Sequence, residues 1–112
     1  NRPEVSSGRI TPVLSTETRV PLPDGIADLV VMINVHHELA DPAAVYAEAA
    51  RLTRPGGSAL VVDWKPVETP KGPSLSVRVS AERIVAHLER SGFTAASVHD
   101  VLPWHSLVVA RR

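Results

Sequence analysis

Residues 29–35 read Leu-Val-Val-Met-Ile-Asn-Val, and this nearly unbroken apolar run decides the fold class. A strand with one wet face alternates polar and apolar residues, whereas a continuous apolar run is typical of a strand covered on both faces in a parallel sheet. A second apolar run follows at residues 59–62. We therefore expect two buried, parallel strands at 29–35 and 59–62, and a protein of the α/β class.

The segment between these runs predicts a helix. Asp41-Pro42 supplies an N-cap residue and a proline suited to the first helical position. Val45, Ala49 and Leu52 then fall on one apolar stripe. Pro55-Gly56-Gly57 ends the helix and turns the chain toward the next strand. Strand, helix and strand joined by short links form a right-handed βαβ unit.

A second helix is expected to begin after Ser80, which can cap it. Its inward face would carry Ile84, Val85 and Leu88, and Gly92 stands where a helix terminator with positive φ belongs. Two strands should follow, at 98–102 and 107–110. Because only a few residues around Pro103-Trp104 join them, they must form an antiparallel hairpin.

The rest of the chain is less regular. Residues 1–9 form a loose, polar lead-in, and Ile10–Leu14 is a short β-prone run that Pro12 restricts to an edge position. Residues 65–79 hold three prolines and a glycine, which favours an ordered surface loop. We expect all of these segments to belong to a single domain spanning 1–112.

Composition excludes several classes of function. The 12 basic and 12 acidic side chains cancel and form no basic stripe, which disfavours nucleic acid as a partner. The chain has no cysteine, so it has neither a disulfide framework nor a thiolate site. No apolar stretch approaches the ~20 residues that span a membrane. We expect a cytoplasmic protein without a membrane partner.

Several phrases of the sequence occur in the order typical of one family. Pro21–Asp28 reads Pro-Leu-Pro-Asp-Gly-Ile-Ala-Asp, Asn34–Leu39 reads Asn-Val-His-His-Glu-Leu, and Arg51–Gly57 reads Arg-Leu-Thr-Arg-Pro-Gly-Gly. Together with Asp63-Trp64-Lys65-Pro66, this succession resembles the class I, Rossmann-like methyltransferases that use S-adenosylmethionine, and a subgroup that acts on small molecules. The resemblance implies a partial Rossmann-like sheet, mostly parallel with a C-terminal antiparallel hairpin. The chain would supply the third to seventh strands of that family's sheet.

The resemblance also implies that the main cofactor-binding loop lies outside the sequence. The six glycines, at positions 8, 25, 56, 57, 72 and 92, include no Gly-x-Gly-x-x-Gly spacing. We expect the C-terminal portion of an S-adenosylmethionine-dependent methyltransferase, inactive by itself. The alternative is a truncated, non-catalytic paralogue that serves as an interaction or dimerisation module.

The strand at 29–35 pairs, in the family, with a strand that this chain would lack. An unpaired apolar edge invites association with another chain. An upstream segment, a second copy in a homodimer, or the lead-in residues could cover it.

Cofactor contacts are expected where the strand 29–35 ends. By resemblance, Asn34 and Val35 border the methionine part of the cofactor, and Thr16 and Glu17 border its adenine. Ligands of open α/β sheets bind at the carboxyl ends of the strands. The alternatives are that Asn34 only caps the strand and that Thr16 and Glu17 form a plain polar turn.

The adjacent His36 and His37 are the catalytic candidates. One of them, with His37 preferred, would accept a proton from the methyl acceptor or orient it. Because neighbouring residues that leave a strand point in different directions, only one can face the pocket. Alternatively, both pack at the start of the helix. No metal is expected, since His-His-Glu-Leu lacks the His-Glu-x-x-His spacing of zinc sites. His87, His99 and His105 receive no role.

Three residues are candidates for binding a small-molecule acceptor. Asp63 and Trp64 end the second strand beside the same pocket, and Arg78 follows the proline-rich loop. Trp64 would wall the acceptor site or simply cover the end of the sheet. Arg78 would clamp an anionic acceptor or pair with Glu82.

Overall fold

The computed structural model describes residues 10–112, so the expected lead-in at 1–9 lies outside the described residues. The elements are, in chain order, β1 (Ala27–Ile33), the 3-10 helix η1 (His36–Glu38), α2 (Pro42–Leu52), β2 (Thr53–Trp64), the 3-10 helix η2 (Leu75–Val77), α3 (Ala81–Arg90), β3 (Thr94–His99) and β4 (His105–Arg111).

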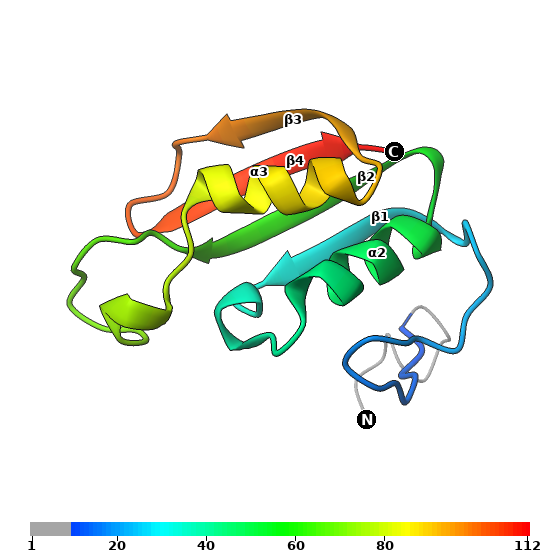
Figure 1. Ribbon diagram of the computed structural model, residues 1–112, viewed down its shortest axis with the longest axis horizontal. Coiled ribbons are helices and arrows are strands. Elements are labelled where there is room, and N and C mark those ends of the chain that lie inside the picture. The colour runs from blue at the N-terminus through cyan, green and yellow to red at the C-terminus, as the bar shows by residue number, and fades with distance from the viewer. Residues whose placement is uncertain (1–9) are drawn as a thin grey trace.

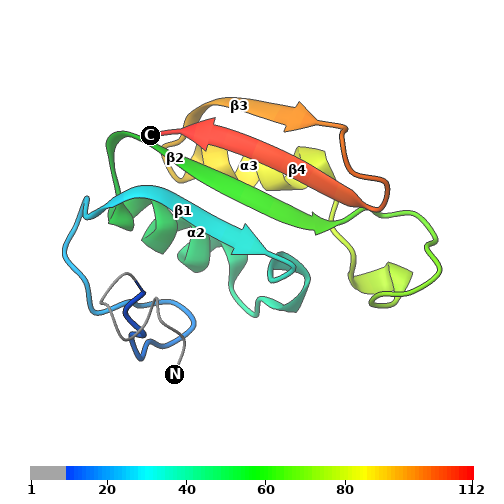
Figure 2. The ribbon, with the colours of Figure 1, turned by 180° about the vertical axis from the view of Figure 1, so that it is seen from behind.

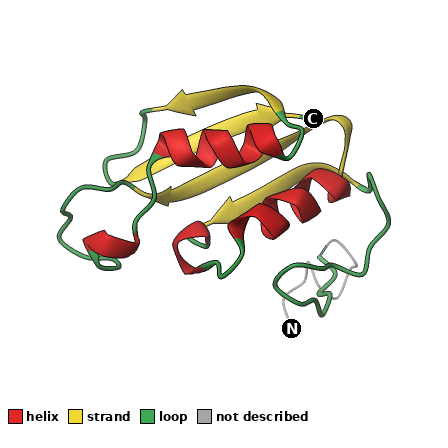
Figure 3. Cartoon of the chain, in the orientation of Figure 1, coloured by secondary structure: helices red, strands yellow, loops and turns green. Residues whose placement is uncertain are grey.

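The strands form one sheet in the order β1-β2-β4-β3 (Figures 1 and 3). β1 runs parallel to β2, with Val31 opposite Leu60, and α2 is the crossover between them. β4 pairs antiparallel with both β2 and β3, and Leu60 lies opposite Val109. The α/β class, the partial Rossmann-like sheet and the C-terminal antiparallel hairpin are therefore confirmed.

Both long helices lie on the same face of this sheet, and the view from behind shows the strands uncovered (Figures 1 and 2). The hydrophobic core fills the space between the helices and the sheet. Its largest fully buried apolar side chains are Tyr46, Phe93, Ile84, Leu88, Val61 and Val108. One layer of helices on one sheet therefore buries a single continuous core.

The one-sided arrangement corrects the expectation that residues 29–35 are covered on both faces. Leu29, Val31 and Ile33 are 52%, 45% and 54% exposed. They point away from α2 and α3, whereas Met32 points toward the core. The apolar pattern predicted the strand correctly, but within the described residues nothing covers its second face.

The β-prone run Ile10–Leu14 is not a strand, which corrects the expectation of a five-stranded portion. Leu14 is 93% exposed, and the segment forms no ladder with a neighbour. A strand needs a partner for its backbone groups, and Pro12 lacks one of the donors that pairing requires.

Two strand boundaries differ from the expected ones. β2 begins at Thr53 rather than at residue 59, so the Pro55-Gly56-Gly57 turn is part of the strand. Gly57 is required there, because an added Cβ would lie 2.9 Å from the carbonyl oxygens of Arg54 and Asp28. β3 covers Thr94–His99 rather than 98–102, since Ala96 packs on the core and fixes where the strand begins.

The helix signals are confirmed. The Asp41 carboxylate accepts a hydrogen bond from the Ala44 N–H at 3.2 Å, and Ser80 Oγ accepts one from the Arg83 N–H at 3.2 Å. Gly92 has a φ of +106° just after α3, as a terminator requires. Neither α2 nor α3, the long helices of residues 10–112, has the length and apolarity to span a bilayer.

Candidate functional site

Several of the predicted site residues lie where β1 and β2 end, because parallel strands place their carboxyl ends at the same edge of the sheet. At this edge the Asn34 N–H donates to the Val62 carbonyl at 2.7 Å, the last link of the strand pair. Asn34 then adopts a φ of +58°, which turns the chain out of β1 and into η1. The turn brings His37 back toward Asp63 at the end of β2.

His37 and Asp63 form a closely held pair. Asp63 Oδ1 lies 2.8 Å from His37 Nδ1, and Asp63 Oδ2 accepts the His37 backbone N–H at 3.2 Å. Oδ1 also accepts the Trp64 backbone N–H at 2.8 Å. The Asp63 side chain is completely buried, and that of His37 is 9% exposed. A buried carboxylate with three N–H donors is well satisfied and holds its partners firmly.

This geometry fixes the tautomer of His37. A carboxylate accepts hydrogen bonds, so Nδ1 carries the proton and the neutral ring keeps its lone pair on Nε2. Among the described residues, Nε2 has only the Glu38 carboxylate nearby, at 3.7 Å. Nε2 therefore presents a lone pair that can accept a hydrogen bond or a proton.

His36 points in the opposite direction, into the protein. Its Nδ1 lies 2.6 Å from the hydroxyl of the buried Tyr46. Burial, with a smaller contribution from the neighbouring His87, lowers the pKa of His36 to about 4. The imidazole is therefore neutral near pH 7. The structure thus separates the two candidate histidines, and only His37 is engaged with the edge of the sheet.

Asn34 also presents an unsatisfied polar atom at this edge. Its Oδ1 is buried and accepts no hydrogen bond within residues 10–112. A buried carbonyl oxygen is costly to leave unpaired, so it suits a ligand with an ammonium or hydroxyl donor. Val35, the next residue, caps η1 and uses its carbonyl to accept the Glu38 N–H at 3.0 Å.

Thr16 and Glu17 approach the same region from the N-terminal segment. Glu17 Oε1 accepts the Ala40 N–H at 2.9 Å, which ties this segment to the link between η1 and α2. Thr16 closes a tight turn by donating its N–H to the Arg19 carbonyl at 3.0 Å. A small hollow of about 160 Å³ lies between Glu17, β1 and α2.

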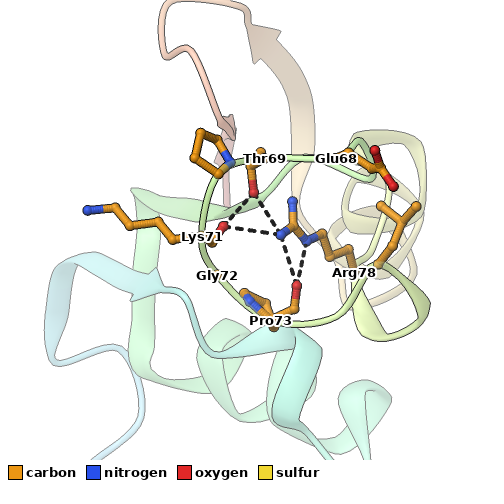
Figure 4. A pocket seen from close by; sticks show the side chains of 8 residues that line it. Glu68, Thr69, Lys71, Gly72, Pro73 and Arg78 are labelled. Atoms are coloured by element: carbon orange, nitrogen blue, oxygen red, sulfur yellow. Dashed lines mark hydrogen bonds between the residues drawn. The ribbon is translucent and has the colours of Figure 1, made fainter.

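Arg78 organises the proline-rich loop at 65–79 (Figure 4). The guanidinium donates to the Pro73 carbonyl at 2.9 Å, to the Val67 carbonyl at 2.7 Å and to Thr69 Oγ1 at 2.8 Å. Further bonds to the Lys65 and Lys71 carbonyls engage all of its N–H groups. The arginine therefore binds its own loop rather than Glu82, and it lines a hollow of about 430 Å³.

Trp64 lies between this loop and the hairpin. The Arg78 guanidinium sits 5.2 Å from the centre of its ring, and the His105 ring packs on it at 4.2 Å. A Cβ added at Gly72 would approach the indole to 3.0 Å, so only glycine fits there without displacing the ring. Trp64 thus covers the end of the sheet and anchors the loop at the same time.

Comparison with known proteins identifies the family. The model of a family described as a methyltransferase domain matches residues 2–61 of the chain. The chain belongs to this methyltransferase family. A solved S-adenosylmethionine-dependent methyltransferase from Aquifex aeolicus is 30% identical, with a TM-score of 0.82 over 96% of this chain and 58% of that one.

Further comparisons also find methyltransferases. The ubiquinone/menaquinone biosynthesis C-methyltransferase of Cupriavidus metallidurans is 35% identical over 69 residues, which is 57% of this chain. Those residues span 28% of that relative's length. Human N-acetylserotonin methyltransferase, solved with S-adenosylmethionine, has a TM-score of 0.70 at 22% identity and shares the fold.

Sequence reasoning missed two residues packed beneath η1, Tyr46 and His87. Tyr46 is fully buried, and its ring stacks on that of His87 at 5.1 Å with an interplanar angle of 16°. A signal was present: His87 is flanked on α3 by Ile84 and Leu88, which both face the core. Within residues 10–112, no group of three or more histidine or acidic side chains is arranged to hold a metal.

Proposed function

We propose that this chain is the C-terminal portion of an S-adenosylmethionine-dependent methyltransferase that acts on a small molecule, with His37 as the proton acceptor. The observation that carries the proposal is the His37–Asp63 pair at the carboxyl edge of β1 and β2, in a chain of a methyltransferase family. Solved structures of similar fold include an S-adenosylmethionine-dependent enzyme.

S-adenosylmethionine supplies an electrophilic methyl carbon and leaves as a neutral thioether. Positioning provides most of the catalysis in such a transfer. A base is needed when the acceptor atom carries a proton at neutral pH. His37 Nε2 takes that proton while Asp63, on the other side of the ring, stabilises the charge. The acceptor is therefore a small molecule with a hydroxyl, an N–H or an acidic C–H group.

The residues at the edge of the sheet fit the cofactor's charged end. The unsatisfied Asn34 Oδ1 suits the ammonium of the methionine part, and Val35 would border it. Thr16 and Glu17, which the Ala40 contact ties to the same region, would border the adenine. The glycine-rich loop of the family has no counterpart in the sequence. We therefore assign most of the binding energy for the cofactor to residues outside these 112.

Trp64 and Arg78 would act on the acceptor through the loop at 65–79. Because the loop carbonyls occupy the N–H groups of Arg78, this arginine shapes the loop and does not clamp an anion directly. Asp63 would act through His37, since its carboxylate is fully buried.

Two experiments test this proposal. Isothermal titration calorimetry of the 112-residue chain with S-adenosylhomocysteine should detect no binding tighter than about 1 mM. Micromolar binding would contradict the proposal that residues outside these 112 supply most of the binding energy for the cofactor. In the complete enzyme, His37→Gln should lower methyl transfer at least ~100-fold. His99→Gln, an exposed histidine on β3, should leave the rate unchanged.

A second candidate function, an interaction or dimerisation module, is supported by the outer edge of β1. Leu29, Val31 and Ile33 are about half exposed on a strand that pairs on one side only, within residues 10–112. Two copies could join antiparallel through these edges, which would place equivalent apolar side chains on one face. Such a homodimer would not require the cofactor.

A further inference from the structure

Three aromatic rings from three different elements meet beneath η1. His36 comes from η1, Tyr46 from α2 and His87 from α3. The His36 and Tyr46 ring centres lie 5.3 Å apart, and those of His36 and His87 lie 5.2 Å apart in an edge-on arrangement. Tyr46 is completely buried and His36 is 6% exposed. The proposed reaction uses none of these three rings.

The hydrogen bond within this cluster joins two neutral groups. Burial raises the pKa of the Tyr46 hydroxyl, so the tyrosine keeps its proton. Burial lowers the pKa of His36 and of His87, so both rings are neutral near pH 7. The Tyr46 hydroxyl and His36 Nδ1 therefore share a hydrogen bond of 2.6 Å between two neutral groups, in which Tyr46 donates when the proton of His36 sits on Nε2.

The cluster lies beneath η1, the short 3-10 helix that also carries His37. In η1 the Glu38 N–H bonds the Val35 carbonyl at 3.0 Å, and the Leu39 N–H bonds the His36 carbonyl at 3.1 Å. A three-residue 3-10 helix with two such bonds has little stability of its own. Its position therefore depends on the anchors at its side chains, and the Asp63 pair is only one of them.

We propose that His36, held by the Tyr46 hydroxyl and packed against His87, is a positioning residue that fixes the orientation of His37. The inference rests on the proposed function, because it assigns a purpose to holding His37. The two neighbouring histidines point to opposite anchors, one at α2 and one at β2, and each restrains the turn from its own side. A shift of His36 would carry the His37 backbone with it.

A purely apolar contact would not restrain the turn in this way. Phenylalanine at position 46 would keep the stacking on His87, yet it would leave the buried Nδ1 of His36 without its hydrogen-bond partner. An unsatisfied buried nitrogen favours conformations in which the ring moves toward water. Since His36 lies in η1, that movement displaces the turn.

Amide hydrogen exchange of the 112-residue chain, resolved by residue, tests the inference with Tyr46→Phe. The His37 N–H, which donates to Asp63, should exchange about tenfold faster than in the wild type. The amides of Val61 and Val62 in β2 should change much less. The Nδ1–H signal of His37 should broaden in the same variant.

The matched control is Val108→Ala, which removes buried methyl groups from β4 and keeps both partners of the Tyr46–His36 hydrogen bond. It should speed exchange in β2 at least as much as at His37. Equal changes at His37 and β2 in Tyr46→Phe would overturn the inference. Neither readout involves methyl transfer, so a failure of the proposed reaction would be recognised separately, by its own assay.

Discussion

The carboxylate of Asp63 holds His37 at two points, with Oδ1 2.8 Å from the ring Nδ1 and Oδ2 3.2 Å from the backbone nitrogen. One buried side chain thereby sets both the tautomer of the imidazole and the position of the turn that carries it. The two residues are 26 positions apart in the chain, and the parallel pairing of β1 with β2 brings them together.

Replacing Asp63 by asparagine should impair the enzyme more than it changes the fold. An amide is a weaker acceptor than a carboxylate and can present an N–H instead, which favours the wrong tautomer of His37. Methyl transfer by the complete enzyme should fall at least ~100-fold. Asp100→Asn, at an exposed residue paired with Lys65, is the control and should retain its rate. Equal losses in both variants would argue against a specific role for Asp63.

Protein stability should decline when the pH falls below about 6.5. Burial lowers the pKa of His36 to about 4, so the unfolded chain binds a proton that the folded chain rejects. The free energy of unfolding should drop by about 2 kcal/mol between pH 7 and pH 5. Urea denaturation at each pH measures it.

His36→Asn should reduce this dependence on pH. Burial is the main cause of the low pKa of His36, and His87, Arg83 and His37 lower this pKa as well. Only the carboxylate of Asp63 raises it. The decrease in unfolding free energy that His36→Asn still shows on acidification is due to His87, whose pKa is lowered by burial, by Arg90 and by Arg83. If the free energy of unfolding of His36→Asn fell between pH 7 and pH 5 by as much as that of the wild type, His36 would not be the source of the pH dependence.

The Glu48–Arg51 pair should contribute more to stability than the surface pair of Asp28 and Arg54. Glu48 Oε2 accepts from Arg51 at 2.6 Å and from the Val20 N–H at 2.7 Å, and the side chain is 9% exposed. Glu48→Gln should cost about 2 kcal/mol, measured by urea denaturation. Arg54→Gln removes an exposed pair and should cost less than ~1 kcal/mol.

The contribution of the Glu48–Arg51 pair to stability should depend on pH in the acidic range. The hydrogen bond from Arg51, helped by the Val20 N–H and the charges of Arg51 and Arg19 and opposed by burial, lowers the pKa of Glu48 to about 2. The contribution is complete above about pH 4.5 and is lost as the pH falls toward 2. A Glu48→Gln variant that loses stability as steeply as the wild type in this range would contradict the prediction.

A charge on the outer strand should abolish any self-association through it. Val31→Lys places an ammonium in the middle of β1, where the wild-type side chain is 45% exposed. If β1 edges pair, the variant should sediment as a monomer while the wild type shows concentration-dependent dimers. Leu75→Lys, at an exposed apolar residue of η2, is the matched control. Dimers that persist in Val31→Lys would exclude this edge as the interface.

Local signals in the sequence were sufficient to predict most elements. Asp41-Pro42 and Ser80 begin helices because a cap depends only on neighbouring backbone groups. The short link through Pro103-Trp104 left an antiparallel hairpin as the sole arrangement. By contrast, the exposure of Leu29 and Val31 depends on whether helices cover a second face, which no property of the strand itself determines.

The placement of Asn34, His37 and Asp63 at one edge of the sheet could be predicted from the sequence, but their side-chain partners could not. The edge of the sheet followed from the fold, and so did the rule that only one of His36 and His37 could face it. The hydrogen-bond partners of the two histidines could not be predicted from the sequence, because tertiary packing brings Asp63 to His37 and Tyr46 to His36. The contacts of Arg78 could not be predicted either, because the fold of the loop brings the Val67 and Pro73 carbonyls to its guanidinium.

The most direct test of the central claim is the protonation pattern of the His37 ring, measured by long-range proton–nitrogen NMR correlation near neutral pH. A proton acceptor held by Asp63 should give a ring protonated at Nδ1, with Nε2 unprotonated. The signal should change to the other tautomer or average between the two in Asp63→Asn. A wild-type His37 with its proton on Nε2 would contradict the account.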